Sequence, residues 1–390
     1  MRYPRLSAWS GALAGLLACA ALAVDSAYDW KLPAWAPRPL VPAGNPMSPA
    51  KVELGRWLFY DTRLSVNGST SCATCHQQAR AFTDGTALAK GATGELHPRN
   101  SMSLANAAYN PTLTWANPQE MALEHQALTP MFGTAPIEMG LAGREEQIRR
   151  LLARDPRYAR LFRAAFPRDA DPYTLDNLTR AIAAFERTLN SFDSPYDRYR
   201  QGGQLDAVSP AAKRGEKLFF SERMQCFHCH GGINFTDSVA HERLDKPEIS
   251  FHNTGLYNLD GRGAFPPDNT GMMEFTKNAR DMGRFRAPTL RNIAVTAPYM
   301  HDGSLATLEE VIAHYAAGGR GNKPGNSAGN SAAGNSARNP LQSEFVAGFT
   351  ITPEETRELV AFLESLTDRG FLTNPAHADP RHPPAKKAAP

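Results

Sequence analysis

Two short stretches of the chain combine paired thiols with an adjoining imidazole. Cys72-Ala73-Thr74-Cys75-His76 and Cys226-Phe227-His228-Cys229-His230 both have the pattern C-x-x-C-H. In this pattern the two thiols bond to the vinyl groups of a haem, and the histidine binds its iron from one side. Zinc ribbons and thioredoxin-like sites also use C-x-x-C, but neither explains a histidine at the next position twice. The sequence therefore predicts two covalently attached c-type haems, held by Cys72, Cys75, His76, Cys226, Cys229 and His230.

The composition is that of a globular protein with two or three domains. The chain has 390 residues, of which 42% are hydrophobic, and its formal net charge is +3. A charge this small, without a basic patch interleaved with aromatic residues, gives no indication of nucleic-acid binding. Four of the five cysteines belong to the two haem motifs, so no pair remains for a structural disulfide.

The N-terminus has the pattern of an export signal over residues 1–27. Arg2 and Arg5 precede an apolar run that is too short to span a membrane comfortably. Because haem is attached to such motifs outside the bacterial cytoplasm, we expect a periplasmic protein. Cys19 lies within a sequence similar to a lipoprotein cleavage box, and lipid on Cys19 would tether the protein to the membrane. Cleavage after Ala23 or Ala27, which we favour, would instead remove this cysteine.

An internal repeat suggests two related haem domains. Ser48-Pro49 and Ser209-Pro210 are typical helix starts, and each helix continues into the pattern G-x-x-L-F-aromatic before its haem motif. We therefore expect a Pro-rich arm at 28–46, an N-terminal haem domain at 47–203 and a C-terminal haem domain at 204–373. A boundary is marked by Gly and Gln at 201–203, and a disordered tail is expected at 374–390.

Apolar periodicity and capping residues predict a mainly α fold. Helices are expected at 145–154, 156–166, 173–190 and 352–366, with another from Thr307. The helix from Thr307 should bury Leu308, Val311, Ile312 and Tyr315, with His314 turned away. Residues 240–283 should form long loops, and the Gly/Asn/Ser-rich residues 318–340 a flexible insert.

Several further stretches resemble the bacterial di-haem cytochrome c peroxidase and MauG superfamily. They are FRAPTLRN at 285–292, TAPYMHDG at 296–303 and PIEMG at 136–140, besides the glycine repeats. The resemblance implies two cytochrome-c-like α-helical domains, each with one haem, and a calcium ion and a tryptophan between the haems. By position the tryptophan is Trp115. The calcium ligands would be the side chain of Asn100 and the backbone oxygens of Thr296 and Pro298, an all-oxygen set that suits a hard cation.

The resemblance also indicates which branch of the superfamily the chain is similar to. Peroxidases fed by small cytochromes carry a methionine fourteen residues after the histidine of the H-D-G motif, and counting from His301 reaches Tyr315. MauG-like enzymes have a tyrosinate ligand on this second iron. An anionic oxygen favours ferric and higher states and lowers the potential, so that both haems share a high-valent state with Trp115 as relay.

The first haem is expected to be the peroxide site. Many relatives have a labile histidine ligand at the position of Ala92, and His97 is five residues away from it. We therefore expect an open sixth position on this iron. Glu138 matches the distal acid that moves a proton between the peroxide oxygens, and Gln126 and Pro130 match its neighbours.

These features predict peroxide-driven oxidation of a tryptophan on a periplasmic partner protein. MauG-like enzymes complete a tryptophan-derived cofactor in methylamine dehydrogenase, and MbnH-like enzymes convert a tryptophan to kynurenine on a copper-binding partner. The stretches HPRNSMSLAN at 97–106 and HYAAGG at 314–319 are similar to the MbnH-like group. The alternative is a peroxidase that takes electrons from a small cytochrome or cupredoxin. A di-haem electron carrier without enzymatic activity is a third possibility.

Overall fold

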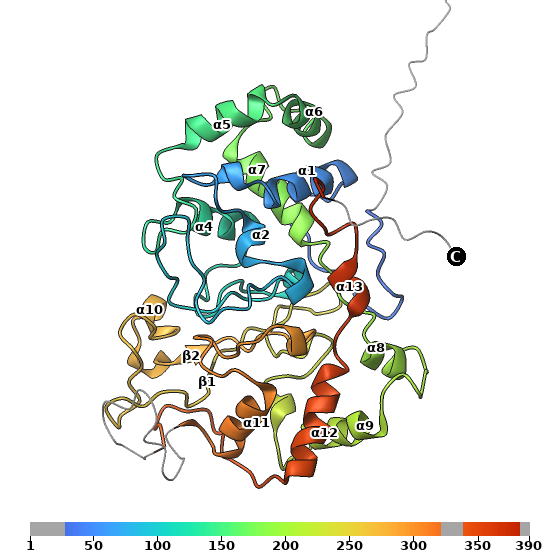
Figure 1. Cartoon of the computed structure of the whole chain (residues 1–390), viewed down its shortest axis with the longest axis vertical. Coiled ribbons are helices and arrows are strands. Elements are labelled where there is room, and N and C mark those ends of the chain that lie inside the picture. Colours follow the sequence, from blue (N-terminus) through green and yellow to red (C-terminus); the bar gives the residue numbers. More distant parts are fainter. Residues whose placement is uncertain (1–27, 321–337, 383–390) are drawn as a thin grey trace, which may run out of the picture.

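The computed structural model of this protein describes residues 28–320 and 338–382 (Figure 1). The expected export signal with Cys19, residues 321–337 of the expected insert and residues 383–390 of the tail lie outside the described residues. Within the two described ranges, no helix combines the length and the apolar character needed to cross a membrane.

Regular structure is nearly all helical. The α-helices are α1 (Pro49–Phe59), α2 (Cys72–Cys75), α3 (Leu123–Gln126), α4 (Leu128–Phe132), α5 (Glu145–Arg154), α6 (Pro156–Ala165), α7 (Leu175–Glu186), α8 (Pro195–Arg200), α9 (Pro210–Phe219), α10 (Met273–Thr276), α11 (Leu308–Ala316), α12 (Pro353–Glu364) and α13 (Arg369–Thr373). Single 3₁₀ turns lie at Thr62–Leu64, Gln78–Arg80, Ala107–Tyr109, Cys226–His228, Ala279–Asp281 and Ile293–Val295. Strands β1 (His252–Asn253) and β2 (Arg284–Phe285) form one short antiparallel pair with His252 opposite Phe285. The longer helices match those predicted, although α7 ends at Glu186 rather than at residue 190.

The first hydrophobic core forms where α1 crosses α7 in the upper half of the molecule (Figure 1). Ser48 caps α1 by accepting a hydrogen bond from the backbone of Lys51, with Pro49 at the first helical position. Leu54 and Leu58 are fully buried against α7. The crossing requires glycine, because a Cβ at Gly55 would overlap the backbone carbonyl of Ala181.

The second core repeats this arrangement where α9 crosses α12 in the lower half. Ser209 caps α9, and Phe219 packs against Phe362 with ring centroids 5.0 Å apart. A Cβ at Gly215 would overlap the carbonyl of Glu358. The repeated glycine therefore has the same task in both halves, which is to let two helices approach closely.

The boundary between the halves differs from the one expected at residues 201–203. Tyr196 of α8 packs on the second core, with its ring 5.3 Å from Phe362. Phe371 of α13 returns to the first core and lies 5.6 Å from Phe82. The chain therefore enters the second half before α8 and comes back to the first half at its end, because each aromatic ring is buried where partners surround it.

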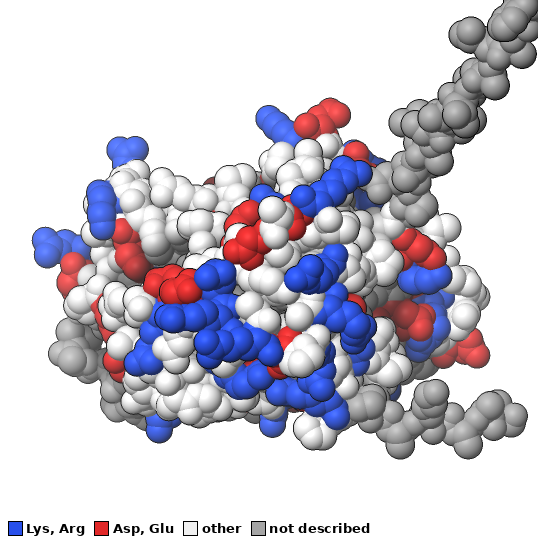
Figure 2. Space-filling view, turned by 90° about the horizontal axis from the view of Figure 1, so that it is seen from above, with Lys and Arg blue, Asp and Glu red and all other residues white. Residues whose placement is uncertain are grey.

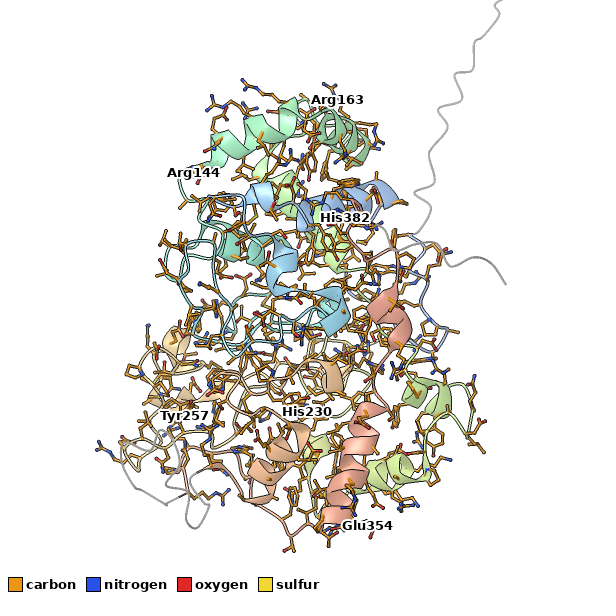
Figure 3. The ribbon with its side chains drawn as sticks, viewed as in Figure 1. Arg144, Arg163, His230, Tyr257, Glu354 and His382 are labelled. Carbon is orange, nitrogen blue, oxygen red and sulfur yellow. The ribbon has the colours of Figure 1, made fainter. Side chains whose placement is uncertain are left out.

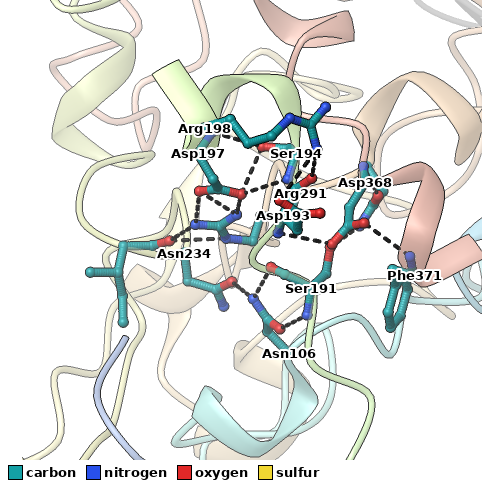
Figure 4. Close-up of polar contacts among 12 residues, drawn as sticks. Asn106, Ser191, Asp193, Ser194, Asp197, Arg198, Asn234, Arg291, Asp368 and Phe371 are labelled. Atoms are coloured by element: carbon teal, nitrogen blue, oxygen red, sulfur yellow. Dashed lines mark hydrogen bonds and ion pairs between the residues drawn. The ribbon is translucent and has the colours of Figure 1, made fainter. Parts of the chain in front are cut away.

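Buried polar contacts stabilise the second half and join it to the first (Figure 4). Arg291 makes a paired contact with Asp197, with Nη1 2.8 Å from Oδ2, and the two side chains are only 2% and 5% exposed. Asn106 of the first half donates to Asn234 of the second at 3.0 Å and accepts from the backbone of Ser191 at 2.7 Å. Such groups are stable in the interior only because their partners are in place.

Part of the expected disordered tail is ordered. Residues 374–382 pack on the first half, where His377 is buried. Its carbonyl accepts from the hydroxyl of Tyr60 at 2.7 Å, and the carbonyl of Ala378 accepts from Arg56 at 2.7 Å. The expectation of disorder was wrong for these residues, because the composition of the tail could not show which groups of α1 bind its backbone.

The end of the molecule formed by α5 and α6 is positively charged. Residues 144–168 contain eight arginines and three carboxylates, a larger surplus than that of the whole chain. Seen from this end, basic side chains lie among acidic ones across the face (Figure 2). This basic end lies on the side of the first core that faces away from the second half (Figure 1).

Candidate haem and peroxide site

The first C-x-x-C-H stretch is a single helical turn that fixes its histidine. The backbone of His76 donates to Cys72 O at 2.9 Å, and its Nδ1 lies 2.8 Å from Phe82 O. Burial lowers the pKa of His76 and so favours the neutral ring. The Nδ1–H then donates to the carbonyl and Nε2 keeps its lone pair, which is the form that binds iron.

The second stretch repeats the arrangement in the other half. The backbone of His230 donates to Cys226 O at 3.0 Å, and its Nδ1 lies 3.1 Å from Phe235 O. Burial lowers the pKa of His230 as well. Figure 3 shows His230 in the lower half, near α11 and α12. Two sites thus offer paired thiols and an imidazole held in the same tautomer, as two c-type haems require.

A cavity of about 400 Å³ lies beside the first stretch. This volume is typical of a site for a small molecule or cofactor. The cavity brings together predicted residues from six separate segments, namely Cys72, Cys75, His76, Asn100, Trp115, Gln126, Pro130 and Glu138.

Arg286 tests whether a haem fits this cavity. Its side chain lines the cavity and is only 3% exposed, but its bonds to Thr114 O and Asn110 Oδ1 are long, at 3.4 Å each. Burial lowers the pKa of Arg286 to about 10, and it forms no ion pair within the described ranges. A buried cation with such weak partners needs an anionic group, and the propionates of a haem supply one. Sequence reasoning placed Arg286 in a motif but did not single it out.

Glu138 is held at the cavity by backbone contacts on both sides. Met139 N donates to Pro130 O at 2.9 Å, and Ala92 N donates to Glu138 O at 2.6 Å. Gly91 packs so closely on the same turn that a Cβ there would overlap the carbonyl of Ile137. Burial raises the pKa of Glu138, so this carboxyl takes up a proton more readily than an exposed one.

His97 lies next to Glu138 in the same cavity, although chain counting placed it five residues from the expected position. Its Nε2 is 4.0 Å from Glu138 Oε1. Its Nδ1 is 3.1 Å from both the backbone N and the backbone O of Arg99. The proximity depends on how two loops fold onto each other, so no spacing in the sequence could have revealed it.

Glu186 is a further cavity residue that sequence reasoning missed. It lies on α7, is 6% exposed, and its Oε2 has no hydrogen-bond partner in the part of the chain that the structure describes. Burial raises the pKa of Glu186 to about 8, so the carboxyl is protonated near neutral pH. The sequence did contain one hint of its burial, because Glu186 directly follows Phe185, which belongs to the apolar stripe of a predicted core helix.

Tyr315 faces the second haem motif. Burial raises its pKa, and the thiols of Cys229 and Cys226 lie near enough to raise it further. The expectation that His314 turns away was wrong, because His314 is 3% exposed and its Nε2 lies 2.9 Å from Thr254 O. The loop at 252–255 covers a second side of α11, which the pattern of one helix could not show. The role of Tyr315 as an iron ligand stays a prediction.

Two more charged groups adjoin the second motif. His252 Nε2 lies 2.6 Å from Asp237 Oδ2, and their ligand atoms and the sulfur of Cys229 lie within 4.8 Å of one another. Three such groups could hold a metal ion, but Cys229 is required for haem attachment. The histidine–aspartate pair is therefore a charged neighbour of the second haem site.

Trp115 connects the first cavity with the second half. Its Nε1 donates to Asn100 O at 2.8 Å, and its own carbonyl accepts from the backbone of Arg286 at 2.8 Å. It also packs against a cluster that contains Phe285 and Met300. This position suits a bridge between the two haem sites, although the bridging role stays a prediction.

The expected calcium ligands lie on adjoining segments. Asn100 N donates to His301 O at 2.8 Å, and His301 follows Pro298 by three residues. The Asn100 side chain donates through Nδ2 to Thr86 O at 2.7 Å, which turns its oxygen the other way. Thr296 begins the same loop as Pro298. Calcium binding by these three residues stays a prediction.

Comparison with known proteins agrees with this geometry. Residues 49–205 match a family described as di-haem cytochrome c peroxidase. The chain is 36% identical over 392 residues to the cytochrome-c peroxidase IdrP1 of Denitromonas iodatirespirans, with 95% of each protein covered. It is 37% identical over 327 residues to the methylamine utilization protein MauG of Methylorubrum extorquens, with 83% of this chain and 80% of MauG covered.

A solved structure extends the likeness to three dimensions. The crystal structure of a MauG-like protein associated with microbial copper homeostasis matches with a TM-score of 0.86 and 47% identity, and it covers 91% of this chain and 100% of that protein. Identity at this level over most of the length, together with two haem motifs and the cavity beside the first, settles the relationship. The chain belongs to the family of di-haem cytochrome c peroxidases and MauG proteins, and it is a haem-dependent oxidoreductase of the peroxidase type with two c-type haems.

Proposed function

We propose that this enzyme uses hydrogen peroxide to oxidise a tryptophan on a partner protein. The observation that carries this proposal is Tyr315, which stands where cytochrome-fed peroxidases have methionine and lies beside Cys226 and Cys229. The 47% identity with a MauG-like protein supports the same branch of the family.

The residues of the first cavity suit proton transfer to and from peroxide. When bound, the haems supply the iron that accepts peroxide and the capacity to hold its oxidising equivalents. Glu138 takes the proton from the inner peroxide oxygen and returns it to the outer oxygen, which then leaves as water. Its raised pKa suits both steps, because partial burial stabilises the neutral form of the carboxyl. Pro130 fixes the turn of Glu138 through its carbonyl, and Gln126 borders the same space.

In the second site, His230 and the phenol oxygen of Tyr315 are the groups that would hold the iron. Burial raises the pKa of this phenol, so the side chain alone would stay protonated. The positive charge of a ferric iron is what lets a buried phenol lose its proton. An anionic oxygen in turn stabilises higher oxidation states than a thioether does.

Electrons would reach the two sites through the protein. Trp115 is bonded to Asn100 on one side and to Arg286 on the other, so it lies on a continuous path between the halves. A calcium ion on Asn100, Thr296 and Pro298 would hold this junction in place. The partner is proposed to be a periplasmic copper-binding protein, since the MauG-like relative is associated with copper homeostasis. Kynurenine is the expected product.

Spectroscopy of the ferric holoenzyme tests the ligand assignment. One high-spin haem and one low-spin haem with His/Tyr ligation are expected in electron paramagnetic resonance. A near-infrared band from sulfur-to-iron charge transfer would show His/Met ligation and contradict the proposal.

Mass spectrometry tests the substrate. Candidate exported copper-binding proteins from the same organism are each incubated with holoenzyme and peroxide, then digested and sequenced. An oxygen-bearing change on one tryptophan is expected, absent without peroxide and with the Glu138→Gln variant. A partner that remains unmodified while peroxide is consumed would contradict this part of the proposal.

An ordinary cytochrome c peroxidase is the second candidate. It is favoured by the 36% identity to IdrP1 over 95% of both chains. Rapid and sustained peroxide reduction with a reduced small cytochrome c or cupredoxin, and no change in any partner tryptophan, would establish it instead.

A further inference from the structure

A hairpin carries His97 over the first cavity. Gly91 N donates to Glu95 O at 2.8 Å, and Lys90 and Leu96 form a bridge that closes the hairpin. His97 N then donates to Ala89 O at 2.8 Å, so the backbone of this histidine is fixed at the base of the hairpin. The placement of His97 therefore follows from backbone hydrogen bonds and not from a mobile side chain.

The same hairpin also holds the turn that carries Glu138. Ala92 N donates to Glu138 O at 2.6 Å, and the carboxylate of Glu95 accepts from Ile137 N at 2.8 Å. Both side chains of the pair are thus mounted on segments that are bonded to each other. A change in one segment would move the other, which keeps the distance between His97 and Glu138 constant.

The orientation of the imidazole is fixed as well. His97 Nδ1 lies 3.1 Å from both the backbone N and the backbone O of Arg99, so it can accept from the one or donate to the other, and in either form Nε2 faces the cavity. That nitrogen lies 4.0 Å from Glu138 Oε1, and both side chains are about three-tenths exposed to the cavity. This separation is too long for a good direct hydrogen bond, but it is suitable for an ion pair or for exchange through one water molecule.

In the part of the chain that the structure describes, the other basic side chains of the cavity form no ion pair with Glu138. The remaining charged side chains that line the cavity are Lys90, Arg99, Glu120, Glu186, Glu274 and Arg286. Arg99 pairs with Glu274, and Glu120 with the exposed His125. Glu95, on the hairpin, points to the backbone of Ile137. Among the residues that the structure describes, His97 is the one basic side chain within 4.0 Å of the Glu138 carboxylate.

We propose that His97 is a positioning residue for Glu138, with Nε2 sharing the proton that Glu138 exchanges with peroxide. The inference rests on the proposed role of Glu138 as that proton acceptor. Proton balance is maintained, since a proton taken from the inner oxygen moves to the Glu138–His97 pair and returns to the outer oxygen. No oxidant other than peroxide is needed.

The pair has a consequence for pH dependence. Burial raises the pKa of Glu138, and the charge of His97 acts in the opposite direction. Loss of His97 should therefore raise the pKa of Glu138 further, so that the carboxyl becomes a proton acceptor only at higher pH. A purely structural role for His97 would change the stability of the hairpin without moving this pH profile.

Cyanide association with the ferric holoenzyme measures the profile without turnover. Hydrogen cyanide must give up its proton when it binds iron, so the rate reports the base in the cavity. Stopped-flow rates between about pH 5 and 9 are compared for the wild type, His97→Asn and His97→Gln. Asparagine keeps an acceptor for Arg99 N, and glutamine keeps the reach of Nε2, but neither side chain can carry a positive charge. Both variants should move the acid limb upward by about one pH unit.

Controls separate this inference from the function on which it rests. His382→Gln removes an exposed histidine at the outer side of the first half and should leave the profile unchanged (Figure 3).

Glu138→Gln should abolish the acid limb, and failure to do so would contradict the role of Glu138 itself. If Glu138→Gln acts as expected while both His97 variants match the wild type, the positioning role alone is wrong. Conversion of a low-spin ferric signal to high-spin in the His97 variants would also overturn it, because His97 would then be an iron ligand.

Discussion

The two halves of this enzyme attach haem in the same way and differ in the groups around the attachment site. In both, a glycine permits a close helix crossing, and a half-buried histidine has its Nδ1 2.8 or 3.1 Å from a backbone carbonyl oxygen. The first half surrounds its site with titratable groups, namely Glu138, His97 and Glu186. The second half offers the half-buried phenol of Tyr315 and a histidine–aspartate pair. If the proposed function is correct, this repeated scaffold separates peroxide chemistry from storage of oxidising equivalents through a few different side chains.

The largest expected effect concerns the buried ion pair of each half. Arg291 and Asp197 are 2% and 5% exposed, whereas Arg187 and Glu124 are 4% and 17% exposed, with shortest contacts of 2.8 Å in both pairs. Asp197→Asn should lower the free energy of unfolding by about 3–5 kcal/mol, because it leaves a buried cation unpaired. Glu124→Gln should cost less, since water can reach that pair. Urea denaturation of the holoproteins measures both, and equal losses would show that the halves do not differ here.

The next effect depends on pH and belongs to the first half. The pKa of Glu186 is raised from 4.5 to about 8 in the folded protein. The folded state therefore binds this proton more tightly than the unfolded state, and its contribution to stability is full below about pH 4.5 and lost as pH rises through 8. The loss has an upper limit of about 5 kcal/mol. Glu186→Gln should flatten this dependence between about pH 5 and 9 in urea denaturation. A slope equal to that of the wild type would show that Glu186 is not the group responsible.

The third prediction removes what distinguishes the second half. Tyr315→Met should raise the potential of the second haem and reduce partner oxidation by about 100-fold, which corresponds to ~2.7 kcal/mol in the barrier. Redox titration and mass spectrometry of the partner measure the two quantities. Tyr199→Phe, on the surface helix α8, is the matched control and should change neither. Full partner oxidation by a Tyr315→Phe variant would contradict a role for the phenol oxygen.

The smallest effect tests what the halves share. Gly55→Ala and Gly215→Ala should each lower the free energy of unfolding by about 1–3 kcal/mol, since the added methyl group meets a backbone carbonyl. Gly44→Ala is the control, because nothing lies within 4 Å of a Cβ at that position. Denaturation curves of the variants and the wild type measure these losses of unfolding free energy. A markedly smaller loss for one glycine would mean that the two helix crossings are not equivalent.

Sequence patterns predicted local structure well where one helix or one motif contained all the information. The caps Ser48, Ser209 and Thr352 begin helices as expected, because capping depends on residues within one turn. The pattern of α11 failed at His314, because a separate loop covers that face. The order of residues 374–382 was missed for the same reason, since their partners lie on α1.

In the candidate site, too, sequence patterns identified the residues that belong to motifs and missed those that depend on contacts between separate segments. Eight predicted residues meet in one cavity, and these were found from motif positions. Arg286, His97 and Glu186 were missed or set aside, because their importance lies in burial and in distances across separate segments. None of the three stands at a spacing from the haem motif that would have identified it.

The sequence by itself predicted where two haems attach, because the attachment motif consists of two thiols and an imidazole within five consecutive residues. It also predicted the mainly helical fold, which the structure confirms, and the ligand role of Tyr315, which stays a prediction. The tertiary structure decided which carboxyls are buried enough to hold a proton and which imidazole lies 4.0 Å from Glu138. Proton affinity depends on desolvation and on charges a few ångströms away, and both arise only when distant segments pack together.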